Sequence, residues 1–397
     1  MAKVRASAPG KCILFGEHAV VFGQPAVAVA IEQRITVSLE LLEKGKDEWY
    51  IDGMKFIASK HPHVEALRSR MWQKKAGAPA LSIHINGDIP PASGLGSSAA
   101  LSVAASACLR AARGRWLRES GEATETEDWA EGFSSKLTDT DVYSDNNGEG
   151  DPARRAGDDG QGGLHVWGEM AIDVDECALL GHAVEAFAQG GRASPMDSSV
   201  CAHGGFVLLS DKVETEADWS YTRMLSTPEG DRTWQVHTLP INTDDQDVYL
   251  VIGNSGVHAP TSLQVAKVAA AMSENPQRMR EIETIGIIAR RGVEALLNGD
   301  FEAVGRAMSE NHLMLRGLGV SCHELENLVR AAAPSSLGVK LTGAGGGGCM
   351  VALTRNPKQT SEAIELAGGR TLISKLGNAG VRIEDHEGLP FWKPLSK

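Results

Sequence analysis

The sequence predicts an α/β (α+β) protein with two domains. Segments with the alternation typical of strands are interleaved with segments of helical periodicity, an order typical of layered α/β or α+β folds. The length of 397 residues is enough for two domains of ordinary size. Glycine is frequent, at 44 residues, and aromatic residues make up only 5%, which suits an enzyme with tight loops.

The first half of the chain supplies most of the predicted strands. Strands are predicted at 4–8, 11–15, 26–31, 35–42, 81–85 and 207–209, and helices at 62–75, 99–109 and about 171–187. The last of these helices has Leu179, Ala183 and Phe187 on one face, and its expected N-cap is Asp173 or Asp175. These elements form a predicted N-terminal domain over residues 1–212.

The second half, residues 213–397, reads as a separate C-terminal domain. Its apolar patterns predict strands at 248–252, 339–341 and 349–353, and helices at 261–273, 278–298, 300–316 and 322–333. Asp300 is expected to cap the third of these helices, because its side chain stands just before the first helical residue.

An acidic insertion separates two regular parts of the first half. Between Arg118 and Asp159 there are 13 acidic and 4 basic side chains, so this stretch carries most of the net charge of −12. Gly, Ser, Thr, Asp, Glu and Asn replace the apolar periodicity over about 117–168. We expect a long solvated or disordered segment there.

Composition excludes several classes of protein. The acidic balance argues against nucleic-acid binding, because phosphates would be repelled. No apolar run approaches about 18 residues, so no membrane span is expected, and no signal peptide precedes the first strand. The six cysteines lack C-x-x-C spacing, which indicates free thiols, no cysteine metal site and a cytoplasmic location.

A glycine-rich turn between a predicted strand and a predicted helix is the most informative segment. The segment 90–100 reads PPASGLGSSAA and follows the alternating run at 81–85. Gly94 and Gly96 would let a ligand approach the backbone, while the helix start offers unpaired N–H groups and the positive end of its dipole. Two serine hydroxyls follow, where a phosphate oxygen or a magnesium ion would find them. The turn therefore indicates a phosphate-binding site.

Two other interpretations of this turn stay open on its residues alone. The spacing Gly94-x-Gly96-x-x-Ala99 also fits the dinucleotide fingerprint, and Glu119 stands where a ribose-binding acid would be. A purely structural turn is the third interpretation. The Walker pattern G-x-x-x-x-G-K-S/T occurs nowhere in the chain.

Two further segments combine glycine with chemically active side chains. The segment 8–23 reads APGKCILFGEHAVVFG and sets Lys11, Glu17 and His18 beside an apolar strand. The segment 340–349 reads KLTGAGGGGC, and five glycines in six positions are costly to order unless something approaches the backbone closely. A surface hairpin and a flexible loop tip are the structural alternatives.

Together the three segments resemble the three motifs of the GHMP kinases, in order and in spread along the chain. Within that family they are most similar to the mevalonate kinases, particularly the archaeal-type enzymes, and the resemblance favours a kinase over the dinucleotide interpretation. It also includes residues 311–315 and 318–320, and covers nearly the whole chain outside about 117–168. The resemblance implies an N-terminal domain with a left-handed βαβ crossover, a ferredoxin-like C-terminal domain and an active site between them.

The resemblance implies ATP- and Mg²⁺-dependent phosphorylation of mevalonate at its 5-hydroxyl, giving 5-phosphomevalonate and ADP for isoprenoid synthesis. A homodimer is compatible with it. The implied catalytic residues are Asp197, which would accept the proton of the hydroxyl, and Lys11, which would screen developing charge. The implied metal ligands are Ser98 and Glu185. The implied ATP phosphate site comprises Pro91, Ser93, Gly94, Leu95, Gly96, Ser97, Ser98 and Ala99, and the implied substrate site comprises Glu17, His18, Thr261, Gly343 and Ala344.

Departures from the family pattern leave two alternatives in view. The segment 189–192 is one residue longer than the archaeal-type pattern, which makes Glu185 a weaker assignment than Asp197. Ser262 stands where a basic residue is often found. The alternatives are another GHMP kinase, acting on phosphomevalonate, homoserine or a sugar, and a GHMP-fold sensor without catalysis.

Overall fold

The fold is described here from a computed structural model. The residues it describes are 3–42, 46, 48–57, 63–64, 80–90, 93–119, 174–188, 193–227, 230–243 and 246–385. Nearly all of the predicted helix at 62–75 and of the acidic insertion at 117–168 lies outside these residues, as does Pro91. Within the described part of the chain, no helix is long and apolar enough to cross a membrane.

The described strands form one nine-stranded sheet and one four-stranded sheet. The larger sheet has the order β4-β3-β5-β2-β6-β8-β7, and β1 pairs with both β2 and β13. Its strands are β1 (Lys3–Phe15), β2 (Ala26–Leu42), β3 (Glu48–Ile51), β4 (Met54–Lys55), β5 (Ala80–Gly87), β6 (Phe206–Ser210), β7 (Asp218–Thr227), β8 (Gly230–Leu239) and β13 (Arg382–Asp385).

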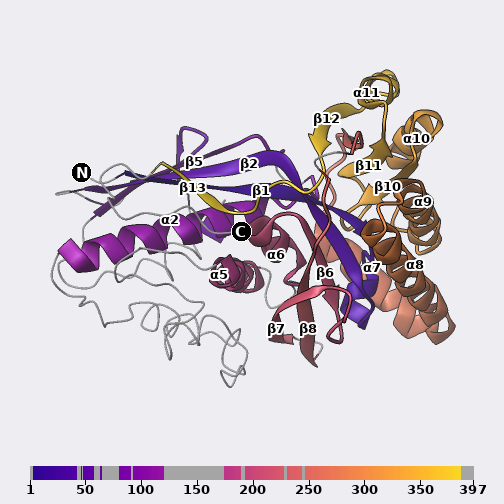
Figure 1. Cartoon of the computed structure of the whole chain (residues 1–397), viewed down its shortest axis with the longest axis horizontal. Coiled ribbons are helices and arrows are strands. Elements are labelled where there is room, and N and C mark those ends of the chain that lie inside the picture. The colour runs from indigo at the N-terminus through magenta and orange to yellow at the C-terminus, as the bar shows by residue number, and fades with distance from the viewer. Residues whose placement is uncertain are drawn as a thin grey trace.

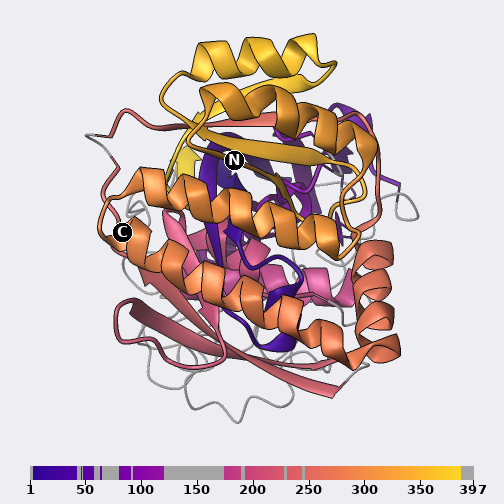
Figure 2. The same cartoon turned by 90° about the vertical axis from the view of Figure 1, so that its right-hand side faces the viewer.

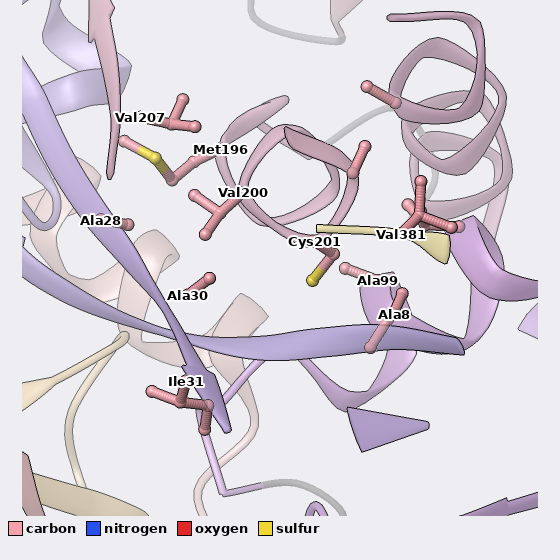
Figure 3. Close-up of a cluster of buried hydrophobic side chains, with 14 of the residues drawn as sticks. Ala8, Ala28, Ala30, Ile31, Ala99, Met196, Val200, Cys201, Val207 and Val381 are labelled. Atoms are coloured by element: carbon pink, nitrogen blue, oxygen red, sulfur yellow. The ribbon is translucent and has the colours of Figure 1, made fainter. Parts of the chain in front are cut away.

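Three described helices lie on one side of the larger sheet (Figure 1). They are α2 (Ser97–Glu119), α5 (Val174–Ala188) and α6 (Met196–His203). Helices α2 and α6 lie against its strands, and α5 packs on those two helices. Small side chains let α6 approach the sheet, since Val200 of α6 lies over Ala28 and Ala30 of β2 and Cys201 lies beside Ala8 of β1 (Figure 3). The close packing of this short helix brings Asp197, in its first turn, against the sheet.

The smaller sheet is antiparallel and has the order β10-β11-β9-β12. Its strands are β9 (Tyr249–Asn254), β10 (Gly338–Thr342), β11 (Cys349–Thr354) and β12 (Arg370–Lys375). Helices follow β9 and β11, so the strand order is that of a ferredoxin-like βαββαβ unit. The resemblance of the motifs to those of the GHMP kinases implied this arrangement.

Five described helices belong to the second half. They are α7 (Thr261–Glu274), α8 (Met279–Leu297), α9 (Phe301–Gly317), α10 (His323–Ala332) and α11 (Pro357–Leu366), with 3₁₀ turns η1 (Ala19–Phe22), η3 (Pro276–Arg278) and η4 (Ala333–Ser335) elsewhere in the chain. Helices α9, α10 and α11 pack on this sheet, α8 runs beside α9, and α7 stands across the others in Figure 2. Asp300 caps α9 as predicted, because its carboxylate accepts a hydrogen bond from the Ala303 N–H at 2.9 Å.

The two halves of the chain interlock. Strands β7 and β8, which follow residue 212, belong to the larger sheet, and β13 returns from the end of the described chain to pair antiparallel with β1. One hydrophobic core includes residues of β1, β2, α8 and α9. The division into domains at 212 and 213 stays a prediction.

Most predicted elements are present, with differences in two strands and one cap, and several short elements of the structure were not predicted. The strands predicted at 4–8 and 11–15 are one strand, β1, with an irregular pairing between Pro9 and Lys11, and 26–42 is likewise one strand. Of the two N-cap candidates for α5, Asp175 lies inside the helix, where its carboxylate pairs with the His203 ring at 3.1 Å, and Asp173 lies outside the described residues. The hairpin β7–β8 was not predicted.

Candidate active site

Lys11 of β1 is the centre of the candidate site. Its side chain is only 3% exposed, and its ammonium lies 3.0 Å from a carboxylate oxygen of Asp197. The same ammonium donates a hydrogen bond to the Gly94 carbonyl at 3.1 Å. Burial by itself would lower the pKa of Lys11, but the Asp197 carboxylate outweighs burial and raises that pKa. Lys11 is therefore a cation at neutral pH.

The glycine-rich turn at 93–98 lies directly over Lys11. Gly94 and Gly96 have φ angles of 79° and 74°, a region that glycine enters without strain. A Cβ on Gly96 would lie 3.0 Å from the Lys11 side chain, so the turn needs glycine there. The Lys11 N–H also donates to the Leu95 carbonyl at 2.9 Å. The turn ends where α2 begins, at Ser97, so N–H groups of the first helical turn face the site.

Asp197 has much more access to solvent than Lys11 does. Its side chain is 33% exposed, whereas that of Lys11 is 3% exposed. One side of the carboxylate is therefore held by a buried cation, and the other can receive a ligand. The N-cap position of α6 is Pro195, and Asp197 lies within the first turn of the helix.

Glu185 of α5 and Ser98 of α2 form the second polar pair. The Ser98 hydroxyl donates to the Glu185 carboxylate at 3.0 Å, and the Glu185 side chain is almost completely buried. Burial, and then the nearby negative charge of Asp197, raises the pKa of Glu185 to about 8. The carboxylates of Asp197 and Glu185 thus lie near each other, and the negative charge of Glu185 is poorly compensated by positive charge.

The donor set of this pair fits a magnesium ion. Mg²⁺ prefers hard oxygen ligands, and proteins usually hold it with one or two carboxylates and leave the remaining positions to water and phosphate. Ser98 and Glu185 supply a hydroxyl and a carboxylate next to the phosphate turn. A cation here would also compensate the buried charge of Glu185. Among the described residues, no group of three or more His, Cys, Asp or Glu side chains forms a metal site of its own.

The glycine run at 343–348 packs against the turn at 93–98. A Cβ on Gly343 would lie 3.3 Å from Gly94, and a Cβ on Gly348 would lie 3.0 Å from the Ser93 carbonyl oxygen. Gly345 approaches the Val320 carbonyl still more closely. The glycines therefore let several backbone segments meet at the site.

The segment 16–18 is held by protein groups. The His18 ring lies 2.9 Å from the Ala344 carbonyl, which links it to the glycine run, and burial lowers the pKa of this histidine. Glu17 is 3% exposed, and its carboxylate is bound by the Lys340 ammonium and by the Asn311 amide, the latter at 3.1 Å. The structure thus gives Glu17 protein partners on both oxygens.

Thr261 and Pro91 are the two predicted site residues whose side chains the structure does not describe. Thr261 is the first residue of α7, and its side chain is not among those described. Helix α7 does come close to the glycine run, because a Cβ on Gly346 would collide with the Gln264 amide. Pro91 lies outside the described residues.

Comparison with known sequences accounts for this combination of motifs. The family model described as the GHMP kinases N terminal domain matches residues 63–134, and that described as GHMP kinases C terminal matches residues 293–368. The curated mevalonate kinase of Thermococcus gammatolerans is 30% identical, over 96% of this chain and 99% of that protein. The chain belongs to the mevalonate kinase family. The mevalonate kinase of Pyrococcus furiosus is 28% identical, again over 96% and 99% of the two chains.

Solved structures of the mevalonate kinase family have the same fold. The Leishmania major enzyme, crystallised with R-mevalonate, matches with a TM-score of 0.59 at 22% identity, over 94% of this chain and 96% of that one. The Methanococcus jannaschii enzyme matches with a TM-score of 0.60 at 20% identity, over 94% and 98%. At these identities the likeness shows the fold alone. It confirms the predicted fold class.

Sequence analysis of this family member did not identify Lys340 and Asn311 as site residues. Lys340 lies in a strand whose five residues are all buried, and a buried lysine needs an anionic partner. The three glycine-rich segments together contain a single carboxylate, Glu17. A buried lysine together with a single carboxylate in these segments was the available indication that Lys340 and Glu17 form a pair.

Proposed function

We propose that this member of the mevalonate kinase family transfers the γ-phosphoryl group of ATP to the 5-hydroxyl of (R)-mevalonate, giving 5-phosphomevalonate and ADP. ATP is the phosphate donor of the family. The family assignment supports the substrate, since the curated relatives named above are mevalonate kinases over nearly their whole lengths.

One observation carries the proposal: the Lys11 ammonium contacts both the Gly94 carbonyl of the phosphate turn and the Asp197 carboxylate. Phosphoryl transfer needs the donor phosphate and the acceptor hydroxyl held in line, with developing charge neutralised. A cation between the two sides serves that need. Asp197 would then bind the hydroxyl and accept its proton, while Lys11 would stabilise charge on the transferred group.

We further propose that Ser98 and Glu185 hold Mg²⁺. When bound, the ion would neutralise charge on the phosphates of ATP. The Ser98 hydroxyl donates to the Glu185 carboxylate beside the turn, and the N–H groups at the start of α2 would bind the same phosphates. The side chains of His18 and Thr261 and the backbone of Gly343 and Ala344 remain the proposed contacts of the acceptor.

The test is ATP turnover with Mg²⁺ against mevalonate, phosphomevalonate, homoserine and galactose, repeated with a chelator and with Asp197→Asn. We expect turnover with mevalonate only, abolished by the chelator. Asp197→Asn should lower kcat by roughly 10²–10⁴-fold, the contribution usual for general acid–base catalysis, and leave ATP binding intact.

Each other outcome would change the conclusion. Turnover with a different acceptor would keep the kinase and exclude mevalonate as its substrate. ATP binding without turnover on any acceptor would favour a non-catalytic sensor. A cytoplasmic location and a homodimer stay predictions, which fractionation and light scattering would test.

A further inference from the structure

Three buried polar side chains from distant parts of the chain meet behind the candidate site. Glu17 follows β1, Lys340 lies in β10 and Asn311 lies in α9, and each is at most 3% exposed. The Lys340 ammonium binds one oxygen of Glu17, and the Asn311 amide donates to the other at 3.1 Å. Neither carboxylate oxygen is left for a ligand.

Burial of this cluster opposes its charges. It raises the pKa of Glu17 and lowers that of Lys340, while each group favours the charged form of the other. A buried ion pair of this kind contributes little net stability compared with apolar side chains of similar volume. Its presence therefore calls for an account other than stability.

The cluster holds the strand segment that carries Lys11. The Lys340 ammonium donates to the Ile13 carbonyl at 3.2 Å, and the Thr342 hydroxyl accepts from the Ile13 N–H at 2.9 Å. Ile13 is two residues from Lys11 on β1, so displacement of one moves the other. The pairing of β1 with β2 is irregular on both sides of this segment. Lys340 and Thr342 of β10 thus hold Ile13 in place, which a regular hydrogen-bond ladder between β1 and β2 would otherwise do.

The same cluster also holds the turn that follows β1. The Asn311 side chain accepts a hydrogen bond from the Gly16 N–H at 3.5 Å while it donates to Glu17. The turn is crowded, because a Cβ on Gly16 would collide with the backbone of Pro25 and Ala26. The segment that follows Lys11 is therefore held at Ile13 and again at Gly16 and Glu17, both times by residues of the second half of the chain.

We propose that Glu17, Lys340 and Asn311 are positioning residues that hold Lys11 between the phosphate turn and Asp197, and that the Glu17 carboxylate does not contact the acceptor. The inference rests on the proposed kinase function. It replaces the substrate contact that the family resemblance implied for Glu17.

The experiment compares Glu17→Gln, Lys340→Met and the double variant Glu17→Gln/Lys340→Met with the wild type. Lys340→Met alone should be strongly destabilised, because it leaves a carboxylate buried without a partner. The double variant should regain most of the wild-type Tm. Its kcat should nevertheless stay at least about tenfold lower, with KM for mevalonate and ATP within about threefold, because the strand keeps its packing but loses its constraint.

Two further variants separate a positioning role from a role in stability, and the KM for mevalonate separates it from substrate contact. Leu328→Ala, on the buried face of α10, is the matched control and should lower Tm at wild-type kcat. Thr342→Val removes the second constraint on Ile13 and should lower kcat without changing the ion pair. A wild-type kcat in the double variant would overturn the proposal. So would a Glu17→Gln enzyme with a tenfold higher KM for mevalonate and unchanged kcat.

A structure of the double variant makes the result independent of the acceptor. The distance between the Lys11 ammonium and the Asp197 carboxylate, 3.0 Å in the wild type, should lengthen. An unchanged distance would contradict positioning. Absence of wild-type turnover on mevalonate would count against the proposed function and leave this structural comparison valid.

Discussion

At the scale of single residues, Gly96 allows the turn to lie against Lys11. Two features require glycine at this position. The φ angle is 74°, and a Cβ would lie only 3.0 Å from the Lys11 side chain. Gly96→Ala should cost about 1–2 kcal/mol of unfolding free energy through backbone strain. It should also lower kcat by about tenfold or more, because a small displacement of Lys11 spoils the alignment for transfer. Denaturant unfolding and steady-state kinetics measure the two effects.

Gly53→Ala provides the control. Gly53 has a similar φ of 76°, but a Cβ there would meet nothing within 4 Å. It should lose comparable stability and keep its kcat. Equal kcat values in the two variants would show that contact between Gly96 and Lys11 has no catalytic consequence.

Site residues were predictable where they stand in local motifs and not where their partners are remote. Lys11, Asp197, Ser98 and Glu185 were identified from their segments, and the structure brings them together, although their roles stay proposals. Glu17 was assigned to the substrate. Its partner Lys340 is 323 residues away, and no pattern within one segment reports a pairing over that separation.

At the scale of elements, His182 fastens α5 to the segment that leads into α6. One ring nitrogen accepts from the Arg223 guanidinium at 2.8 Å, and the other lies 2.9 Å from the Ala193 carbonyl. Burial, and then the charge of Arg223, lowers the pKa of His182 from 6.5 to about 3. The unfolded chain therefore binds this proton more readily than the folded protein does.

The contribution of His182 to stability should be complete above pH 6.5 and decline as the pH falls toward 3. Between pH 6.5 and pH 5 we expect a loss on the order of 2 kcal/mol from this one group. Urea unfolding across this range should show a flatter pH dependence for His182→Gln than for the wild type. The exposed His258 is the control, and His258→Gln should keep the wild-type slope. Identical slopes in all three proteins would contradict the assignment.

Prediction of elements succeeded where periodicity is long and strong. The apolar face of α8 and the buried strand β9 were evident from sequence. Helix α6 was not predicted as an element, because eight residues are too few to establish a helical period, although it carries Asp197. The hairpin β7–β8 was missed because many of its side chains are polar and exposed, which obscures the alternation of a strand.

At the scale of the whole molecule, Arg34 joins the start of the chain to its last described strand. Its guanidinium donates to the Ser7 hydroxyl at 2.7 Å, to the Ala379 carbonyl at 2.7 Å and to the Gly380 carbonyl at 2.6 Å. The next N–H, that of Val381, donates to the Ala202 carbonyl of α6 at 2.9 Å. The position of α6 thus depends on a segment far from it in sequence.

Arg34→Met should lower the free energy of unfolding by about 2–3 kcal/mol, because several charged hydrogen bonds are lost at once. A several-fold lower kcat should accompany this change, since α6 carries Asp197. Arg355→Met is the control, because its pair with Glu302 is exposed on both sides and should change stability by less than about 0.5 kcal/mol. Thermal unfolding and turnover test both variants, and an Arg34→Met enzyme as stable as this control would refute the prediction.

Fold class and family were predictable for the whole molecule, and the comparisons confirm both. The left-handed crossover came from the family resemblance alone, because hydrophobic periodicity carries no information on handedness. Interlocking of the halves was also unpredictable. Strand β13 is four residues long, too short to be recognised, and only its pairing with β1 gives it significance.

The return of β13 to β1 has a consequence for the order in which the protein is made. A ribosome delivers β13 long after β1, because most of the chain lies between the two strands. Until then β1 lacks one of its neighbours, and α6 lacks the hydrogen bond from Val381. A nascent chain that already contains Lys11, the phosphate turn and Asp197 therefore has unfinished support for all three. Phosphoryl transfer should begin only when synthesis of the last strand is complete.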